Sequence, residues 1–182
     1  VDTIIRHAEA IRREGRGKLF VMGCLVERYR NELQHELPEV DGWFGVNRPQ
    51  EVISQLGLAY RQELTGERIF SGPSHYAYLK VSEGCDRTCA FCAIPDIRGR
   101  YISAPLEELV EEARLLASQG VKELILIAQD LTLYGTDLYG RQMLPELVRR
   151  LAAIDSLEWI RLHYLYPADF PLEILEIMQE NP

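Results

Sequence analysis

Residues 80–100 read Lys-Val-Ser-Glu-Gly-Cys-Asp-Arg-Thr-Cys-Ala-Phe-Cys-Ala-Ile-Pro-Asp-Ile-Arg-Gly-Arg. They hold three of the four cysteines of the chain, Cys85, Cys89 and Cys92, with the spacing Cys-x3-Cys-x2-Cys. The apolar alternation of residues 76–81 just before them predicts a strand. Pro95 and Gly99 predict that the loop after it has no regular structure. The sequence therefore predicts three thiols on one loop at the C-terminal end of a strand.

Three thiolates on a short loop can converge on one metal centre, and soft sulfur ligands favour zinc or an iron–sulfur cluster. Structural zinc usually takes four ligands from paired knuckles, whereas this chain has a single trio. A four-iron cluster held by three cysteines keeps one iron open, while electron-transfer clusters normally have four. The trio therefore indicates a catalytic cluster. The alternatives are a zinc loop with His75 as fourth ligand, or a disulfide with a spare thiol.

The trio, with Phe91 directly before its last cysteine, resembles the cluster loop of the radical S-adenosylmethionine (SAM) enzymes. In that family the open iron chelates the amino and carboxylate groups of SAM, and reduction yields a 5′-deoxyadenosyl radical. The resemblance implies that Cys85, Cys89 and Cys92 hold a 4Fe-4S cluster. It also implies that Phe91 lies near the adenine of SAM.

Composition limits the other functions that the chain can have. Of its 182 residues 47% are hydrophobic, which is ample for a packed core, and no apolar run is long enough for a membrane span. Clustered cysteines without a signal peptide predict a reducing cytoplasm and metal ligation. The net charge of −8 argues against direct nucleic-acid binding and suits a basic protein as partner. A first residue, Val1, inside a helical pattern suggests a fragment with sequence missing on both sides.

The first third of the chain predicts a small α/β domain with a parallel sheet. Helical periodicity and short apolar runs alternate there, with helices predicted at residues 2–13, 25–37 and 49–56 and strands at 18–22 and 43–46. Cys24 follows the first strand, at the carboxyl end where open α/β sheets place their sites. We expect residues 1–57 to be the C-terminal part of this domain and residues 58–74 to be a linker.

Residues 75–182 repeat a strand–loop–helix unit three times. The strands are predicted at residues 76–81, 124–128 and 159–165, and the helices at 103–118, 144–154 and 172–179. Parallel units of this kind have right-handed crossovers, and three are too few to close a barrel. The fold class is therefore α/β: a partial α/β N-terminal domain, then the first half of a TIM-like radical SAM (β/α) barrel.

Functional residues of such a barrel gather on the loops after its strands. The loop after the second strand, residues 128–140, has two Tyr-Gly pairs and two aspartates. Gln129 and Asp130 open it and are our candidates for contacting SAM or substrate. His163 is predicted to lie within the third strand, where it could as easily be a core histidine, and it is not a candidate catalyst. The sequence singles out no catalytic side chain.

Two further segments resemble one branch of the radical SAM enzymes, the methylthiotransferases. Residues 20–29, with residues 38–41 shortly after, are similar to the segment that carries the last of three cysteines in their N-terminal domain. Those three hold a second 4Fe-4S cluster, so the resemblance makes Cys24 a ligand, with the other two expected upstream. Residues 128–135 resemble the RimO type, whereas Leu131 and Leu133 depart from its usual threonine and tyrosine.

The RimO-type resemblance implies methylthiolation of the β-carbon of an aspartate in a small-subunit ribosomal protein. It further implies SAM and two clusters as cofactors, with an electron donor and a sulfur source as partners. A transfer-RNA methylthiotransferase, which carries out the same chemistry on adenosine, is the first alternative. A non-enzymatic module that holds zinc on the cysteine loop is the second.

Overall fold

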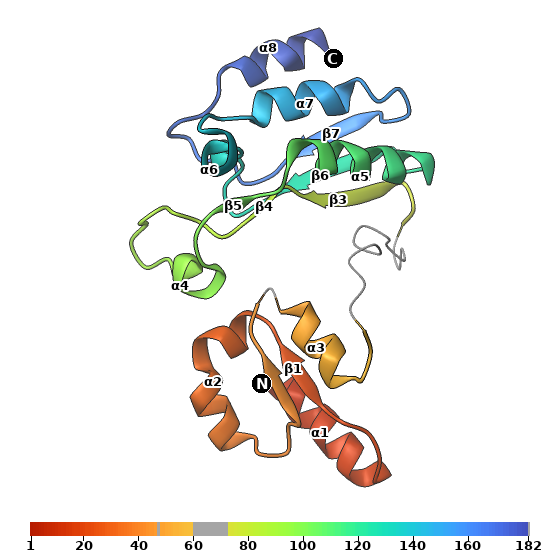
Figure 1. Cartoon of the computed structure of the whole chain (residues 1–182), viewed down its shortest axis with the longest axis vertical. Coiled ribbons are helices and arrows are strands. Elements are labelled where there is room, and N and C mark those ends of the chain that lie inside the picture. The colour runs from red at the N-terminus through yellow and green to blue at the C-terminus, as the bar shows by residue number, and fades with distance from the viewer. Residues whose placement is uncertain (47, 60–72, 182) are drawn as a thin grey trace. The chain divides into compact units, whose positions relative to one another are not determined.

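The computed structural model describes residues 1–46, 48–59 and 73–181. These residues form two compact units, one built on strands β1 and β2 and the other on strands β3, β6 and β7 (Figure 1). The predicted linker, residues 58–74, lies mostly outside the described residues. Among the residues that the structure describes, no helix is long and apolar enough to cross a membrane.

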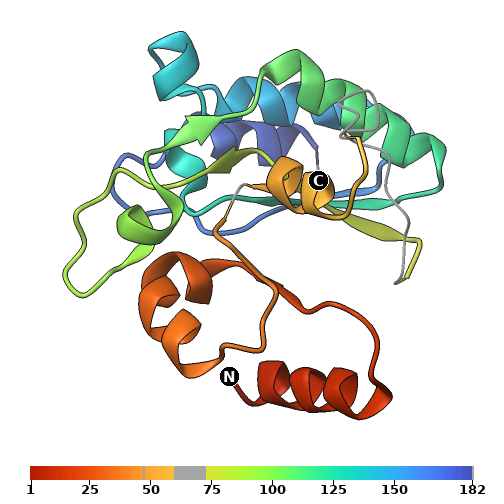
Figure 2. The same ribbon diagram turned by 60° about the horizontal axis from the view of Figure 1, so that its bottom comes forward.

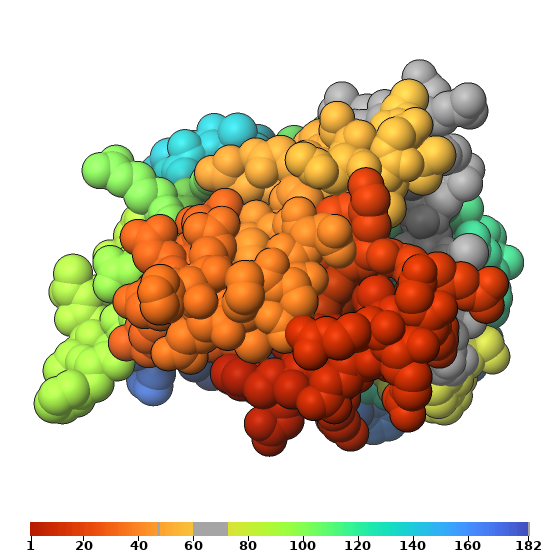
Figure 3. Space-filling model, turned by 90° about the horizontal axis from the view of Figure 1, so that it is seen from below, coloured from red at the N-terminus to blue at the C-terminus, as the bar shows by residue number. Residues whose placement is uncertain are grey.

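The first unit alternates helices and strands as predicted. Its elements are α1 (Asp2–Glu14), β1 (Phe20–Met22), α2 (Cys24–Glu36), β2 (Gly42–Phe44) and α3 (Pro49–Gln55). The two strands pair in parallel, and the core beside them consists of Val26, Leu33, Leu37, Val40 and Trp43. Figure 3 shows the face of this unit on which α1 (red) and α2 (orange) are at the surface. The sheet places the start of α2 directly after β1.

The second unit contains a parallel sheet in the order β3-β6-β7, which confirms the predicted succession of units. Its strands are β3 (Tyr76–Lys80), β6 (Glu123–Ile127) and β7 (Trp159–Leu162), and its long helices are α5 (Leu106–Ser118), α7 (Leu144–Ala152) and α8 (Glu173–Glu180). Figure 1 shows α5 and α7 on one side of the sheet, with α8 beside α7.

The core of the second unit lies between the sheet and these helices. Leu124 and Leu126 of the central strand are fully buried in it, together with Leu79 of β3. Alternate residues of a strand face opposite sides of a sheet, and Tyr78 on the other side is 47% exposed. One face of the sheet is therefore packed against helices, and the other is partly open at the level of Tyr78.

The cysteine loop is more regular than the sequence predicts. It lies between β4 (Ser82–Glu83) and β5 (Ile102–Ser103), which pair antiparallel, and it includes α4 (Ile94–Arg98), as Figure 2 shows. The prediction that Pro95 forbids regular structure is wrong, because proline is well suited to the first turn of a helix. Two-residue strands carry no periodic signal, so β4 and β5 were not predicted.

The third strand is shorter than predicted and ends at Leu162. His163 lies just beyond it, although its N–H still donates to the carbonyl of Leu126 at 3.2 Å. Tyr164 then has a φ of 64°, in the left-handed region, which ends the extended backbone. The prediction that His163 lies within the strand is therefore wrong, and the residue stands at the rim of the sheet.

Candidate functional site

The three cysteines of the loop differ in exposure. Cys85 is buried at the end of β4, and its N–H donates to the carbonyl of Gly99 at 3.1 Å, which ties the two ends of the loop together. Cys89 and Cys92 are exposed and are linked by a turn in which the N–H of Cys92 donates to the carbonyl of Cys89 at 3.2 Å. Phe91, between them, has a φ of 65° and a fully exposed ring.

The chemistry of the loop suits a soft metal centre, since all three thiols are free of disulfides and two are accessible. Within the described ranges, no three His, Cys, Asp or Glu side chains are grouped so that they could hold a metal ion. The loop thus carries the three thiols without gathering them around one point. A bound cluster would require Cys89 and Cys92 to approach Cys85.

The zinc alternative with His75 as a ligand does not fit the structure. His75 precedes β3, and its ring packs edge-on against Tyr76. The cysteine loop follows the other end of this five-residue strand. At about 3.3 Å per residue the strand alone separates the two by about 16 Å. His75 therefore does not belong to the cysteine site.

Arg87, between the first two cysteines, joins the loop to the ends of the other two strands. Its Nε donates to Asp130 Oδ2 at 2.5 Å, and its Nη2 donates to Thr132 Oγ1 at 3.1 Å. Its Nη1 donates to Asp169 Oδ2 at 3.2 Å, and the guanidinium lies 4.0 Å from the ring centroid of Tyr166. Burial would lower the pKa of Arg87, but the two carboxylates more than offset it and raise that pKa.

Asp130 is held inside the protein. The residue is only 2% exposed, and its carboxylate accepts hydrogen bonds from Arg87 and from both the backbone N–H and the hydroxyl of Thr132. Its carbonyl accepts a further bond from the hydroxyl of Tyr101 at 2.9 Å. The structure thus gives Asp130 a partner on the cysteine loop, which the sequence did not indicate.

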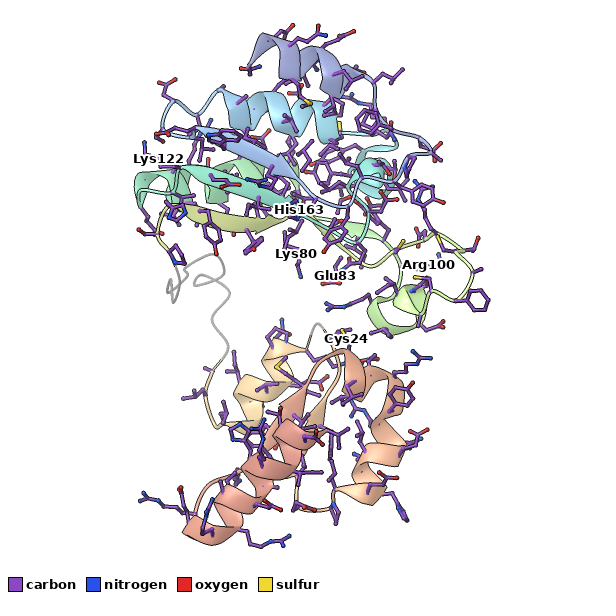
Figure 4. The ribbon with its side chains drawn as sticks, turned by 180° about the vertical axis from the view of Figure 1, so that it is seen from behind. Cys24, Lys80, Glu83, Arg100, Lys122 and His163 are labelled. Carbon is purple, nitrogen blue, oxygen red and sulfur yellow. The ribbon has the colours of Figure 1, made fainter. Side chains whose placement is uncertain are left out.

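Gln129 has the opposite orientation and lines a cleft of about 490 Å³ at the carboxyl ends of all three strands. Its buried Oε1 has no hydrogen-bond partner among the described residues. The cleft is also lined by Tyr78, Lys80, Ile127, Ala128, His163 and Tyr164. Figure 4 shows Lys80 and His163 on the same side of the sheet, away from α7. The cleft can therefore offer a polar ligand the ammonium of Lys80 and the imidazole of His163.

Lys80 in this cleft forms an ion pair with Glu83, whose side chain is 11% exposed, at 2.9 Å. Lys80 and Arg87 are not among the residues predicted from the sequence, and His163 is not a predicted site residue. The position of Lys80 could have been predicted from strand alternation. Lys80 is two residues after the exposed Tyr78, so the two side chains face the same side of the sheet. Arg87 had no such signal, since its partner Asp130 is 43 residues away.

The loop after β6 is fixed to the start of α5 by polar contacts. It contains a 3-10 helix, η2 (Leu131–Leu133), and a short helix, α6 (Thr136–Tyr139). Asp137 accepts hydrogen bonds from the backbone N–H and the hydroxyl of Ser103, at 2.8 and 2.6 Å. The buried hydroxyl of Tyr134 donates to the carbonyl of Ala104, and burial raises its pKa. These contacts hold the loop after β6 against residues 103 and 104.

These contacts make part of the stability depend on pH. Burial raises the pKa of Asp137, but the bonds from Ser103 and nearby backbone amides more than offset it, so the pKa lies below 3.8. The stabilisation is present above pH 3.8 and is lost as the pH falls through the lower folded-state value. Asp137→Asn should therefore reduce the acid-induced loss of unfolding free energy, by less than about 1 kcal/mol because the residue is exposed. Urea titrations between acidic and neutral pH measure this, with exposed Asp155→Asn as control.

Comparison with known proteins matches the second unit to a family. The model of the radical SAM superfamily covers residues 79–182. Curated proteins called ribosomal protein uS12 methylthiotransferase RimO are 52% identical in Flavobacterium johnsoniae and 53% identical in Porphyromonas gingivalis. Each alignment spans 100% of this chain and 42% of the relative, so the chain covers about two fifths of their length.

A solved structure has a similar fold. It is the radical SAM methyltransferase TsrM from Kitasatospora setae, determined with tryptophan and a SAM analogue. The TM-score is 0.64 at 18% sequence identity, over 96% of this chain and 42% of that one. At this identity the likeness concerns the fold, and it agrees with the parallel sheet and helices described above.

Proposed function

Because the chain belongs to the radical SAM superfamily, we propose that it is part of a methylthiotransferase acting on ribosomal protein uS12. The reaction replaces one hydrogen on the β-carbon of an aspartate by a methylthio group. The observation that carries the proposal is the trio of free cysteines on the loop at the strand ends, inside the matched region. The identity of 52–53% with proteins named for this activity supports the choice of substrate.

Cys85, Cys89 and Cys92 would hold a 4Fe-4S cluster that leaves one iron for SAM. When bound, this cluster supplies the electron that splits SAM and so provides a radical able to remove hydrogen from an unactivated carbon. The exposed ring of Phe91 is available to stack against the adenine. Gln129, Lys80 and His163 would orient polar groups of SAM or of the substrate in the cleft beside the loop.

The first unit would carry the second cluster, from which the sulfur would be delivered to the substrate. Cys24 begins α2 directly after Gly23, at the carboxyl end of β1. Gly23 has a φ of 124°, which favours glycine and lets the chain turn sharply into the helix. Cys24 would be one ligand of that cluster. This assignment divides the chain as residues 1–57, a linker at 58–74 and the barrel part at 75–182.

The partners follow from the charge and from the chemistry. A chain with a net charge of −8 is suited to a basic ribosomal protein, and a substrate of this kind supports a cytoplasmic location for the enzyme. A low-potential electron donor and a sulfur source are also required. A second SAM molecule would supply the methyl group. Binding of transfer RNA, the first alternative, would require a basic surface.

The test is an assay of the intact, anaerobically reconstituted protein with SAM, a strong reductant and sulfide. We expect a uS12 peptide to gain the mass of one methylthio group in place of one hydrogen. The same peptide with asparagine at the target aspartate is the control and should stay unmodified. Modified adenosine in transfer RNA, with an unchanged peptide, would instead establish the first alternative. Bound zinc without any cluster signal would establish the second.

A further inference from the structure

One side chain connects the loops that follow all three parallel strands. Arg87 belongs to the cysteine loop after β3 and β4. It contacts Asp130 and Thr132 after β6, and Asp169 and Tyr166 after β7. Its side chain is 17% exposed and that of Asp130 is 3% exposed, so this ion pair is largely removed from water.

We propose that Arg87 is a positioning residue that fixes the cysteine loop to the rim of the sheet. It would thereby hold the cluster at a set distance from the cleft. The inference rests on the proposed function, which supplies the cluster. It extends that function by assigning to Arg87 the alignment between the site where the radical forms and the site where it reacts.

The geometry favours arginine over any other cation at this position. Nε and both terminal nitrogens donate to oxygens of four residues, Asp130, Thr132, Asp169 and Ala168, while the flat face lies over Tyr166. A planar guanidinium can satisfy this set of acceptors, whereas the ammonium of lysine is a point charge. Lysine at position 87 would therefore keep the charge but lose most of the alignment.

Two other hydrogen bonds of residues 85–92, within the described part of the chain, act at the base of the loop. Asp86 accepts a hydrogen bond from the N–H of Tyr101 at 3.1 Å, and Cys85 is bonded to Gly99. The turn between Cys89 and Cys92 is a local contact. Arg87 therefore supplies the long-range connection from the cysteine-bearing segment to the ends of β6 and β7. Without it, residues 85–92 would keep, among the residues that the structure describes, the bonds at the base of the loop and the local turn between Cys89 and Cys92.

The experiment compares variants of the intact protein in two states. In the metal-free protein, hydrogen exchange reports how well residues 84–93 are ordered. In the reconstituted protein, iron content and the ratio of methylthiolated peptide to 5′-deoxyadenosine report alignment. The variants are Arg87→Gln, Arg87→Lys, Asp130→Asn and the double variant R87Q/D130N. The control is Arg100→Gln, which removes the same charge from the same loop, at a side chain without a hydrogen-bond or charged partner among the described residues.

We expect Arg87→Gln to speed exchange of residues 84–93 at least about tenfold and to lower the product ratio by a similar factor. Arg87→Lys should have the same two effects, because the lysine ammonium keeps the positive charge but cannot replace the several directed hydrogen bonds of the planar guanidinium. The double variant leaves no buried charge unpaired. Its melting temperature should therefore return to that of the wild type, whereas hydrogen exchange of residues 84–93 should remain fast. The Arg100→Gln control should behave as the wild type.

Equal exchange and equal product ratios in Arg87→Gln and Arg100→Gln would overturn the inference. Full recovery of loop protection in the double variant would do so too, because neutralising a buried charge would then be sufficient. If Arg87→Gln does not fold, Arg87→Lys decides by the same two measurements. If the wild type modifies no peptide, the proposed function fails, while exchange in the metal-free protein still decides whether Arg87 orders the loop.

Discussion

Cys89→Ala is expected to abolish cleavage of SAM in the intact protein, with 5′-deoxyadenosine falling to the level seen without enzyme. A cluster that already depends on three cysteines would be left with two protein ligands. Because Cys89 is exposed, its removal leaves no cavity, and the free energy of unfolding of the metal-free protein should change by less than about 0.5 kcal/mol. The loss would therefore be chemical, without a change in the fold.

Cys24→Ala is the matched comparison, since it removes a thiol from the other unit. This variant should still produce 5′-deoxyadenosine but should transfer no methylthio group. Electron paramagnetic resonance of the reduced protein provides a second measurement. The signal of the first cluster should change on addition of SAM in the wild type and in Cys24→Ala, and should be missing in Cys89→Ala. Continued 5′-deoxyadenosine production by Cys89→Ala would refute the ligand assignment.

The long elements could be predicted because their signals are local. The apolar periodicity of α5 and the continuous apolar run of β6 each lie within one short stretch of sequence. The short elements within the two loops, β4, β5, α4, η2 and α6, could not be predicted in this way. Proline at the start of α4 indicated a loop, although the same residue is favourable in the first helical turn.

The candidate site likewise contains residues that a local pattern in the sequence predicts and residues whose role depends on distant contacts. The spacing of the cysteines is visible in the sequence, and so is the position of Gln129 at the end of a strand. The role of Asp130 was not visible, because it depends on Arg87, which is distant in the chain. Gln129 lines the cleft together with Ile127 and Ala128, whereas the carboxylate of Asp130 is buried and bonded to Arg87. Only the folded protein shows which residue of this pair lines the cleft.

Gly84→Ala is expected to have the largest effect on stability near the site. Gly84 has a φ of 80°, and an added Cβ would lie 2.0 Å from the carbonyl oxygen of Arg100 and 2.7 Å from that of Gly99. These atoms belong to the backbone and cannot move aside as a flexible side chain would. Overlap and strain together should lower the free energy of unfolding by about 2–5 kcal/mol. Thermal and urea unfolding measure the loss.

Gly99→Ala is a close control for this substitution. Gly99 lies at the other end of the same loop with a φ of 77°, but an added Cβ would meet nothing within 4 Å. It should therefore suffer only the backbone strain, about 1–3 kcal/mol. Gly84 also directly precedes Cys85, so its displacement should reduce iron binding even in molecules that remain folded. Equal free energies of unfolding in the two variants would mean that the positive φ alone requires glycine at position 84. Equal iron contents would mean that the close approach of the two ends of the loop does not set the position of Cys85.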